Sequence, residues 1–173
     1  MLLHSGELRI LRAGTERIAN LELLWKALYE HHATIAPQLG PVRSPEESWE
    51  RRHLRYQRLL NQPESFVLIA EQAERVVGYA MIAVHDGSDT WQTSDQIAEL
   101  ETLSVLPDAR GAGVGSALMY AMYEELRQAE ITEITVNVVA SNKDALRFYE
   151  RHNLIPKIIM FQGSIQHMLK EET

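Results

Sequence analysis

A glycine-rich segment lies between an apolar run and a helical pattern in residues 103–120, LSVLPDARGAGVGSALMY. Pro107 ends the apolar run, and Gly111, Gly113 and Gly115 alternate just before apolar residues at helical spacing. Glycine loses more conformational entropy on folding than other residues, so three of them at a helix start need a reason. Bare amides at the positive end of a helix dipole form a cradle for phosphate or pyrophosphate. The alternative is a βα turn in which the glycines only let helix and strand pack closely.

The residues around this segment exclude two common phosphate sites. A P-loop ends in Gly-Lys-Ser/Thr, whereas Gly115 is followed by Ser116 and Ala117. A dinucleotide site needs an acid at the end of the next strand to bind the ribose hydroxyls. That strand ends in VNVVA, where Asn137 is the one polar residue. An anion cradle of another kind and a packing turn both stay open.

Length and composition predict one domain, residues 1–173, with a core large enough to be stable without disulfides or structural metals. Cysteine is absent, which excludes disulfides, thiolate zinc sites and cysteine nucleophiles. The opening MLLHSGELRILRAG has too short an apolar stretch for a signal peptide, and no run approaches a membrane span. We therefore expect a cytoplasmic protein without a membrane partner.

The formal net charge is −7, from 17 basic and 24 acidic residues. This balance argues against broad nucleic-acid binding, which requires a basic face that displaces counterions. An acidic chain suits a cationic partner such as an amine, although acidic surfaces also serve solubility.

Hydrophobic periodicity predicts a mixed α/β protein with the order β-α-α-β-β-β-α-β-α-β-β. Thr15 is a plausible cap of the first helix, and Ser44 caps the second, where Glu47 closes a capping box. Helices are expected in residues 15–33, 44–60, 114–129 and 141–152. Strands are expected in residues 7–13, in 65–87 (two, joined at Gln72–Glu74), in 97–106, in 131–139 (central in the sheet) and in 155–170 (two, around Gly163).

Two motifs together resemble the GCN5-related N-acetyltransferases. The stretch RGAGVG matches the family's acyl-CoA signature, Gln/Arg-x-x-Gly-x-Gly/Ala, at Arg110, Gly113 and Gly115. The later stretch NKDALRFYERHNL matches the family's Asn-x-x-Ala-x-x-Phe-Tyr helix at Asn142, Ala145, Phe148 and Tyr149. The predicted element order is also that of the family, so the resemblance covers nearly the whole chain.

The resemblance implies a mostly antiparallel, twisted sheet of about seven strands with four helices on its two faces. Its fourth and fifth strands would splay apart. One departure is Asn153, which stands where the family usually has a glycine after the helix. Asparagine tolerates the left-handed conformation of a helix C-cap, so we expect the turn to survive.

The resemblance also implies that acetyl-CoA is the cosubstrate and that no metal takes part. The pantetheine arm would lie between the splayed strands, against the backbone amides of Leu103 and Val105. The loop and the start of its helix would hold the pyrophosphate. The expected cofactor-binding residues are Leu103, Val105, Arg110, Gly111, Ala112, Gly113, Val114, Gly115, Ser116 and Asn142.

Three candidate catalytic residues follow. Tyr149 matches the family's frequent general acid, although it is also compatible with a core aromatic residue whose hydroxyl is hydrogen-bonded. Glu99 and Glu101 share one side of their strand by alternation, which is unusual for a core face. Glu99 precedes Arg110 by eleven residues (110 − 99), the offset at which some family members carry a glutamate base. Alternatively, both glutamates line a solvated cleft and attract a cationic substrate.

The acceptor pocket would be built by the segments HHATIAPQLGPVR and HDGSDTWQTSD. The residues of interest there are His31, His32 and Arg43, and Asp86, Asp89, Trp91 and Asp95. The acidic loop favours a cationic amine, whereas the arginine and the histidines suit a carboxylate. We predict acetyl transfer to a primary amine of a small molecule, and family habit suggests a homodimer. The alternatives are a protein amine as acceptor, a non-catalytic acyl-CoA-binding or regulatory domain, and an unrelated nucleotide-binding domain.

Overall fold

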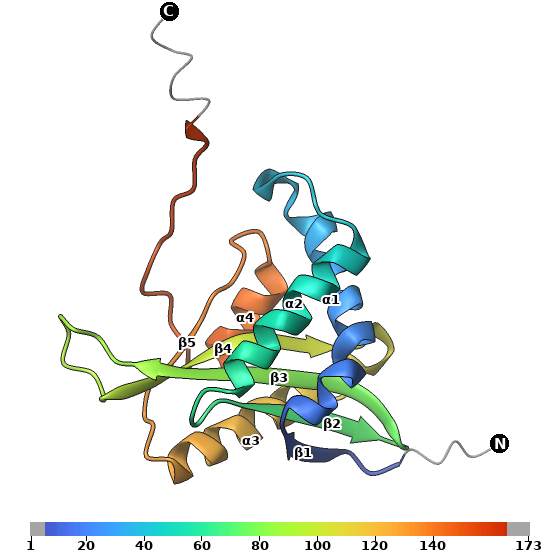
Figure 1. Cartoon of the computed structure of the whole chain (residues 1–173), viewed down its shortest axis with the longest axis horizontal. Coiled ribbons are helices and arrows are strands. Elements are labelled where there is room, and N and C mark those ends of the chain that lie inside the picture. Colours follow the sequence, from blue (N-terminus) through green and yellow to red (C-terminus); the bar gives the residue numbers. More distant parts are fainter. Residues whose placement is uncertain (1–5, 166–173) are drawn as a thin grey trace, which may run out of the picture. The chain divides into compact units, whose positions relative to one another are not determined.

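The computed structural model describes residues 6–165 (Figure 1). It divides into two compact units. The first unit extends to Asn142 and contains the sheet, and the second begins at Lys143. Each unit is described by itself. Among the described residues, no helix has the length and apolar character that crossing a membrane requires.

The first unit is built on a mixed five-stranded sheet with the order β1-β2-β3-β4-β5. Its neighbouring strands are antiparallel, except that β5 pairs with β4 in parallel. The strands are β1 (Arg9–Ala13), β2 (Phe66–Gln72), β3 (Arg75–Asp86), β4 (Gln96–Val105) and β5 (Ile134–Val136).

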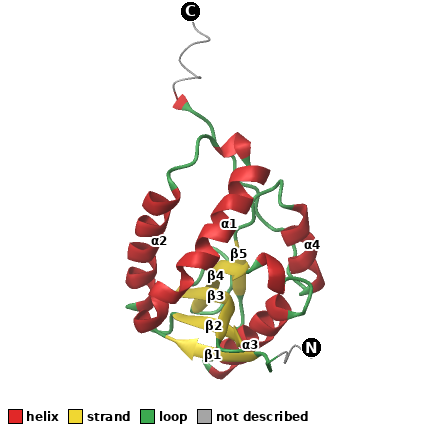
Figure 2. Cartoon of the chain, turned by 90° about the vertical axis from the view of Figure 1, so that its right-hand side faces the viewer, coloured by secondary structure: helices red, strands yellow, loops and turns green. Residues whose placement is uncertain are grey.

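Helices α1 and α2 cover one face of this sheet, and α3 covers the other (Figure 2). The α-helices of the first unit are α1 (Glu22–Ile35), α2 (Pro45–Leu60) and α3 (Val114–Gln128). Three short 3₁₀ helices accompany them: η1 (Thr15–Leu21), η2 (Pro37–Leu39) and η3 (Pro107–Ala109). The second unit contains α4 (Lys143–Arg151).

The core beneath α1 and α2 is made by side chains that alternate along β2 and β3. Val67 and Ile69 of β2, and Tyr79 and Met81 of β3, are fully buried there. They pack against Leu24, Trp25, Trp49 and Tyr56 of the two helices. Alternation with a period of two places these residues on one face of the sheet, which leaves the opposite face for α3.

Helix α3 approaches the sheet closely at Gly78 of β3. A Cβ at this position would lie 3.1 Å from Ser104 O and 3.1 Å from Val114 Cγ1, and 3.3 Å from Leu118 Cδ1. The missing side chain therefore lets the first turn of α3 rest directly on the backbone of β3.

Several local predictions are confirmed. The Ser44 hydroxyl accepts a hydrogen bond from the Glu47 N–H (3.2 Å), so Ser44 is the N-cap of α2. The β2–β3 hairpin closes on a two-residue turn, because Gln72 pairs with Arg75. Both central turn residues, Ala73 and Glu74, have positive φ (50° and 61°), as a type I′ turn requires.

Two expectations at the start of the helices are wrong. Residues 15–21 form a 3₁₀ helix instead of the first turns of α1, and Gly14 is its N-cap without any side-chain cap, so Thr15 does not have that role. Instead, the Gly14 N–H donates to Glu16 Oε1 (3.0 Å), so this glutamate supplies the acceptor two residues downstream. The Glu47 carboxylate does not act as a simple capping-box partner, because it pairs with Arg43 and Arg51.

The expectation of about seven strands with residues 131–139 in the centre is also corrected. The described sheet has five strands, and β5 is a half-exposed segment of three residues at its edge. Residues 156–164, expected to contain strands, have no regular structure, and Phe161 is 91% exposed. Residues from Gln166 onward lie outside the described range. A β-branched apolar run favours an extended chain, but a strand also needs a neighbour with which to pair.

Candidate active site

Strand β4 contains a β-bulge at Glu101. Thr102 lies opposite Met81 of β3 and Leu100 lies opposite Ile82, so Glu101 has no counterpart on β3. A bulge adds one residue to one strand and locally increases its twist. It therefore changes which edge of β4 each later N–H group faces.

The N–H groups of Leu103 and Val105 point away from β3. The Leu106 N–H donates to Val77 O at the end of β3 (2.9 Å). Because successive backbone groups of a strand alternate in direction, the Ser104 N–H faces β3 like that of Leu106, and the N–H groups of Leu103 and Val105 face the opposite edge. These are the two amides for which sequence resemblance implies contact with pantetheine.

That opposite edge is open for part of its length. Strand β5 pairs with β4 over three residues only, from Ala98 with Ile134 to Leu100 with Val136. Within the described residues, no strand pairs with this edge of β4 beyond Leu100. The expected separation of the fourth and fifth strands corresponds to this early end of pairing.

Two glycines of the loop adopt a backbone conformation that favours glycine. Gly111 and Gly113 have φ of +76° and +83°, a left-handed conformation that side chains other than glycine rarely adopt. A Cβ at either position would meet nothing within 4 Å, so neither glycine is required for packing. Close packing of α3 depends on Gly78 instead. Close packing therefore does not explain these two residues, whose positive φ is set by the turn itself.

The loop leads directly into α3, with Gly113 as the N-cap. The N–H groups of Val114 and Gly115 belong to the leading amides for which a helix provides no acceptor of its own. The Arg110 side chain turns back, and its Nε donates to Val105 O (3.0 Å), which ties the loop to the end of β4. This hydrogen bond fixes the glycine loop, which connects the open edge of β4 to the start of α3.

Glu99 lies at a junction of three segments. Its Oε1 accepts a hydrogen bond from Asn137 Nδ2 (2.8 Å), just after β5, and its Oε2 lies 3.9 Å from His85 Nε2 of β3. The side chain is 25% exposed, so solvent reaches it. Sequence reasoning missed His85, for which no motif exists. The sequence singled out Asn137 as the one polar residue at the end of an apolar strand, but it did not indicate that Glu99 is its partner.

Glu101, two residues further on, has a different environment. Its side chain is 8% exposed. Its Oε1 accepts from Arg52 Nη1 and from Arg55 Nε (2.6 Å each), and its Oε2 accepts from Arg55 Nη2 (2.8 Å). The two glutamates that sequence alternation treated alike are therefore distinguished by their partners. Glu101 anchors α2 to the bulge of β4.

A buried cluster of hydroxyl groups supports this anchor. The Tyr56 hydroxyl donates to Thr102 Oγ1 (2.6 Å) and lies 2.9 Å from the Tyr79 hydroxyl. Burial raises the pKa of Tyr56 to about 12 and the pKa of Tyr79 well above its ordinary value. Both phenols are therefore neutral over the whole physiological pH range.

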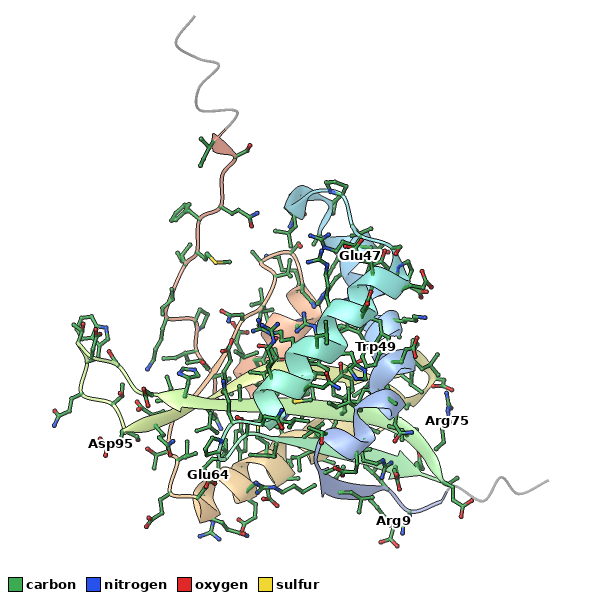
Figure 3. The ribbon with its side chains drawn as sticks, viewed as in Figure 1. Arg9, Glu47, Trp49, Glu64, Arg75 and Asp95 are labelled. Carbon is green, nitrogen blue, oxygen red and sulfur yellow. The ribbon has the colours of Figure 1, made fainter. Side chains whose placement is uncertain are left out.

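The two segments expected to form the acceptor pocket have distinct structures. The loop between β3 and β4 is closed by a hydrogen bond from the Gly87 N–H to Asp95 O (2.8 Å), and Asp95 lies at its end (Figure 3). Trp91 in this loop is 76% exposed. At the end of α1, burial lowers the pKa of His32, and the nearby charges of His31 and Arg52 lower it further.

Tyr149 and Asn153 belong to the second unit. The Phe148 and Tyr149 rings meet edge to face, with centroids 5.3 Å apart. Asn153 has φ of +63°, and the N–H of Leu154 donates to Tyr149 O (3.1 Å). This is a Schellman C-cap with asparagine in the glycine position, as predicted. Asn142 precedes α4, and its N–H donates to Val139 O (2.8 Å). The general-acid role of Tyr149 stays a prediction.

Fold and site together define an α/β protein of the acyltransferase type, with a strand edge that opens beside a glycine loop and a helix start. The chain belongs to the acetyltransferase (GNAT) family, whose model matches residues 25–154.

Relatives with known names give the same family. The chain is 30% identical over 154 residues to a mycothiol acetyltransferase of Acidothermus cellulolyticus, which covers 83% of this chain and 43% of that one. It is 46% identical over 57 residues to an aminoalkylphosphonate N-acetyltransferase of Salmonella typhimurium, covering 32% of this chain and 36% of that one. The match to the mycothiol acetyltransferase spans less than half the length of that relative.

Solved structures share the fold. A GCN5-related N-acetyltransferase from Ralstonia eutropha JMP134 has a TM-score of 0.74 at 13% identity, covering 91% of this chain and 99% of that one. The aminoglycoside N-acetyltransferase AAC(6')-Iy, solved in complex with CoA, has a TM-score of 0.70 at 16% identity, and the match covers 95% of this chain and 99% of that one.

Proposed function

We propose that this protein transfers the acetyl group of acetyl-CoA to the primary amine of a small molecule, by direct attack of the amine on the thioester. The observation that carries this proposal is the open edge of β4. There the outward N–H groups of Leu103 and Val105 lead through a glycine loop into the start of α3.

The residues present fit a CoA molecule. Pantetheine carries amide groups that can pair with the outward amides of β4 as an added strand would. A pyrophosphate suits the helix start, where the N–H groups of Val114 and Gly115 and the helix dipole favour negative charge. When bound, acetyl-CoA supplies an activated acetyl thioester. The proposed binding set is Leu103, Val105, Arg110, Gly111, Ala112, Gly113, Val114, Gly115, Ser116 and Asn142.

Glu99 is the better candidate for the base. Its carboxylate is accessible and is oriented by Asn137, so it can take the amine's proton directly or through one water molecule. Glu101 is nearly buried, and its oxygens already accept three hydrogen bonds from Arg52 and Arg55, so its role is to hold those arginines. Tyr149 donates a proton to the thiolate as the carbon–sulfur bond breaks and the carbon–nitrogen bond forms.

The names of the relatives support a small-molecule acceptor. They include acetyltransferases named for mycothiol, for aminoalkylphosphonates and for aminoglycosides. These three names refer to small molecules, whereas one solved structure with the same fold, at 16% identity and a TM-score of 0.64, is named as a ribosomal-protein-alanine N-acetyltransferase. Because both of the curated sequence relatives are named for small molecules, we place the acceptor of this chain in that broad class.

The test combines calorimetry with turnover. We expect Glu99→Gln to bind CoA as the wild type does and to lose about 100-fold or more in kcat, the usual contribution of a general base. Tyr149→Phe should behave in the same way. Glu74→Gln, at the exposed tip of the β2–β3 hairpin, is the matched control and should keep both properties.

Two results would contradict the proposal. If CoA binds tightly but thiol release never exceeds hydrolysis across a broad amine panel, the chain is a non-catalytic acyl-CoA-binding domain. If calorimetry detects no heat with CoA, the glycine loop is not its cradle.

A further inference from the structure

We propose that the acceptor amine also carries a compact oxyanion group, a carboxylate or a phosphonate, and that four arginines on and beside α2 bind this group. This inference rests on the proposed function and names the substrate class. The arginine cluster consists of Arg43, Arg51, Arg52 and Arg55.

The arginine cluster lines a pocket. Its volume is about 220 Å³. The pocket is open to solvent and is large enough for a small charged group. Glu47, near the start of α2 (Figure 3), pairs with Arg43 and Arg51 of this lining. The lining residues are Trp25, Arg43, Ser48, Arg51, Arg52 and Arg55.

The charges of the cluster are not balanced. Arg43 and Arg51 share a single oxygen of Glu47, at 2.8 and 3.0 Å. Arg52 and Arg55 share Glu101. Four guanidinium groups therefore pair with two carboxylates among the described ion pairs, and the Glu99 carboxylate also acts electrostatically on Arg55. The cluster keeps an excess of positive charge in a chain of net charge −7.

Hydrogen-bond donors are also left over. A guanidinium has five N–H donors in a rigid fork that fits carboxylate and phosphate-like oxygens. In the described contacts Arg51 bonds Glu47 through Nε, and Arg43 through one Nη. The remaining N–H groups of these two arginines are available to a ligand in the pocket.

Arg52 is held in place before any ligand arrives. Its guanidinium lies over the Trp25 ring, 4.0 Å from the centroid, and the Trp25 Nε1–H donates to Ser48 Oγ (3.2 Å). Glu101 also bonds this guanidinium. Because Arg52 is ordered already, the pocket avoids part of the entropy cost of arranging long side chains around an anion.

The cluster lies close to the proposed base. Glu101, which holds Arg52 and Arg55, follows Glu99 by two residues on β4, a separation of about 7 Å along a strand. A molecule whose amine reaches Glu99 while its oxyanion meets Arg52 and Arg55 therefore has its two groups only a few bonds apart, and Arg43 and Arg51 line the same pocket. Short aminoalkyl acids have this spacing, whereas polyamines lack the anion.

The test uses direct binding to the full chain with CoA present. The probes are aminopropylphosphonate, γ-aminobutyrate and n-butylamine, which have similar length and differ in the anionic group. By calorimetry we expect both acids to bind at least about tenfold more tightly than the uncharged-tail amine, as charge-assisted hydrogen bonds imply. The ranking of phosphonate against carboxylate then identifies the oxyanion.

Variants on one helix assign the effect to the cluster. Arg51→Gln should remove most of the preference for the acids, and Arg52→Lys should weaken it while keeping the charge. Arg58→Gln is the matched control, because Arg58 lies on α2 and bonds only the carbonyl of Leu54 within the described contacts. Thermal melting of each variant establishes that the fold is retained.

Equal affinity for the three probes, or a preference that survives Arg51→Gln in a folded protein, would overturn the inference. Loss of the bound phosphonate on addition of CoA would also overturn it, since the arginines would then belong to the cofactor site. Failure of the proposed acetylation has a different signature: the acids still bind through the arginines, but no thiol is released.

Discussion

Single side chains decide how α2 is attached to the bulge of β4. Tyr56 of α2, Tyr79 of β3 and Thr102 of β4 bring three hydroxyl groups together in a fully buried position. A buried hydroxyl without a partner costs free energy, so these groups depend on one another. The same attachment positions Glu101 and the arginines that it holds.

We predict that Tyr56→Phe lowers the free energy of unfolding by about 1–3 kcal/mol, because Thr102 and Tyr79 lose their shared partner. Urea denaturation measures this change. Adding Thr102→Val should recover part of the loss, since it removes one of the hydroxyls that Tyr56→Phe leaves without its hydrogen bond to Tyr56. An unchanged urea midpoint in the single variant would show that the cluster contributes nothing to stability.

Most of the local features were predictable from the sequence, although the expected cap at Thr15 and the capping box at Glu47 were not found. The Ser44 cap, the Gln72–Glu74 hairpin and the asparagine C-cap at Asn153 all depend on residues within a few positions of one another. The failures, at β5 and at residues 156–164, concern strands whose existence depends on a neighbour. Periodicity records an extended, apolar segment but does not name the strand with which it pairs.

Helix α3 ends in a similar C-cap, in which a glutamate occupies the position that usually favours glycine. Glu130 adopts φ of +59°, and the N–H of Ile131 donates to Leu126 O (2.9 Å), which is a Schellman cap. We predict that Glu130→Gly raises the free energy of unfolding by up to about 1 kcal/mol, because glycine removes the left-handed strain. Gln128→Gly, still within the helix, should lower it by a similar amount. Chemical denaturation of both variants checks the two signs.

The glycine loop gives a prediction for binding. Gly113→Ala should destabilise the chain by about 1 kcal/mol through strain at φ of +83°, and should weaken CoA binding by displacing the start of α3. Gly40→Ala is the control, with φ of +99°, ψ of −175° and nothing within 4 Å of an added Cβ. This conformation is essentially restricted to glycine, so we expect Gly40→Ala to lose at least as much stability as Gly113→Ala and to keep CoA affinity. Calorimetry and thermal melting separate the two effects, and equal CoA affinities would contradict the cradle.

At the scale of the whole molecule, surface ion pairs predict how stability responds to acid. The carboxyl pKa of Glu124 is lowered to about 2, first by hydrogen bonding to Arg127. The pKa values of Glu47 and Asp108 are lowered by hydrogen bonds to Arg51 and to Arg75.

Below the ordinary values of 4.5 for glutamate and 3.8 for aspartate, the unfolded chain binds protons that the folded chain still excludes. The free energy of unfolding should therefore fall as pH decreases from about 5 toward 2. Denaturation at successive pH values measures the slope, and added salt should reduce it because these groups are exposed. A slope unaffected by Arg127→Gln would show that the Glu124 pair takes no part.

The sequence by itself determined the helix start with its glycine loop, the caps at Ser44 and Asn153, the hairpin and the family, because these depend on short-range chemistry and on ordered motifs. Only the tertiary structure decided the partners of Glu99 and Glu101, since these come from distant segments: Arg55 is 46 residues from Glu101, and Asn137 is 38 from Glu99. Spacing along the chain cannot specify such pairings. They arise when helix packing and strand register bring separate elements together, and that step also gathers four arginines into one pocket.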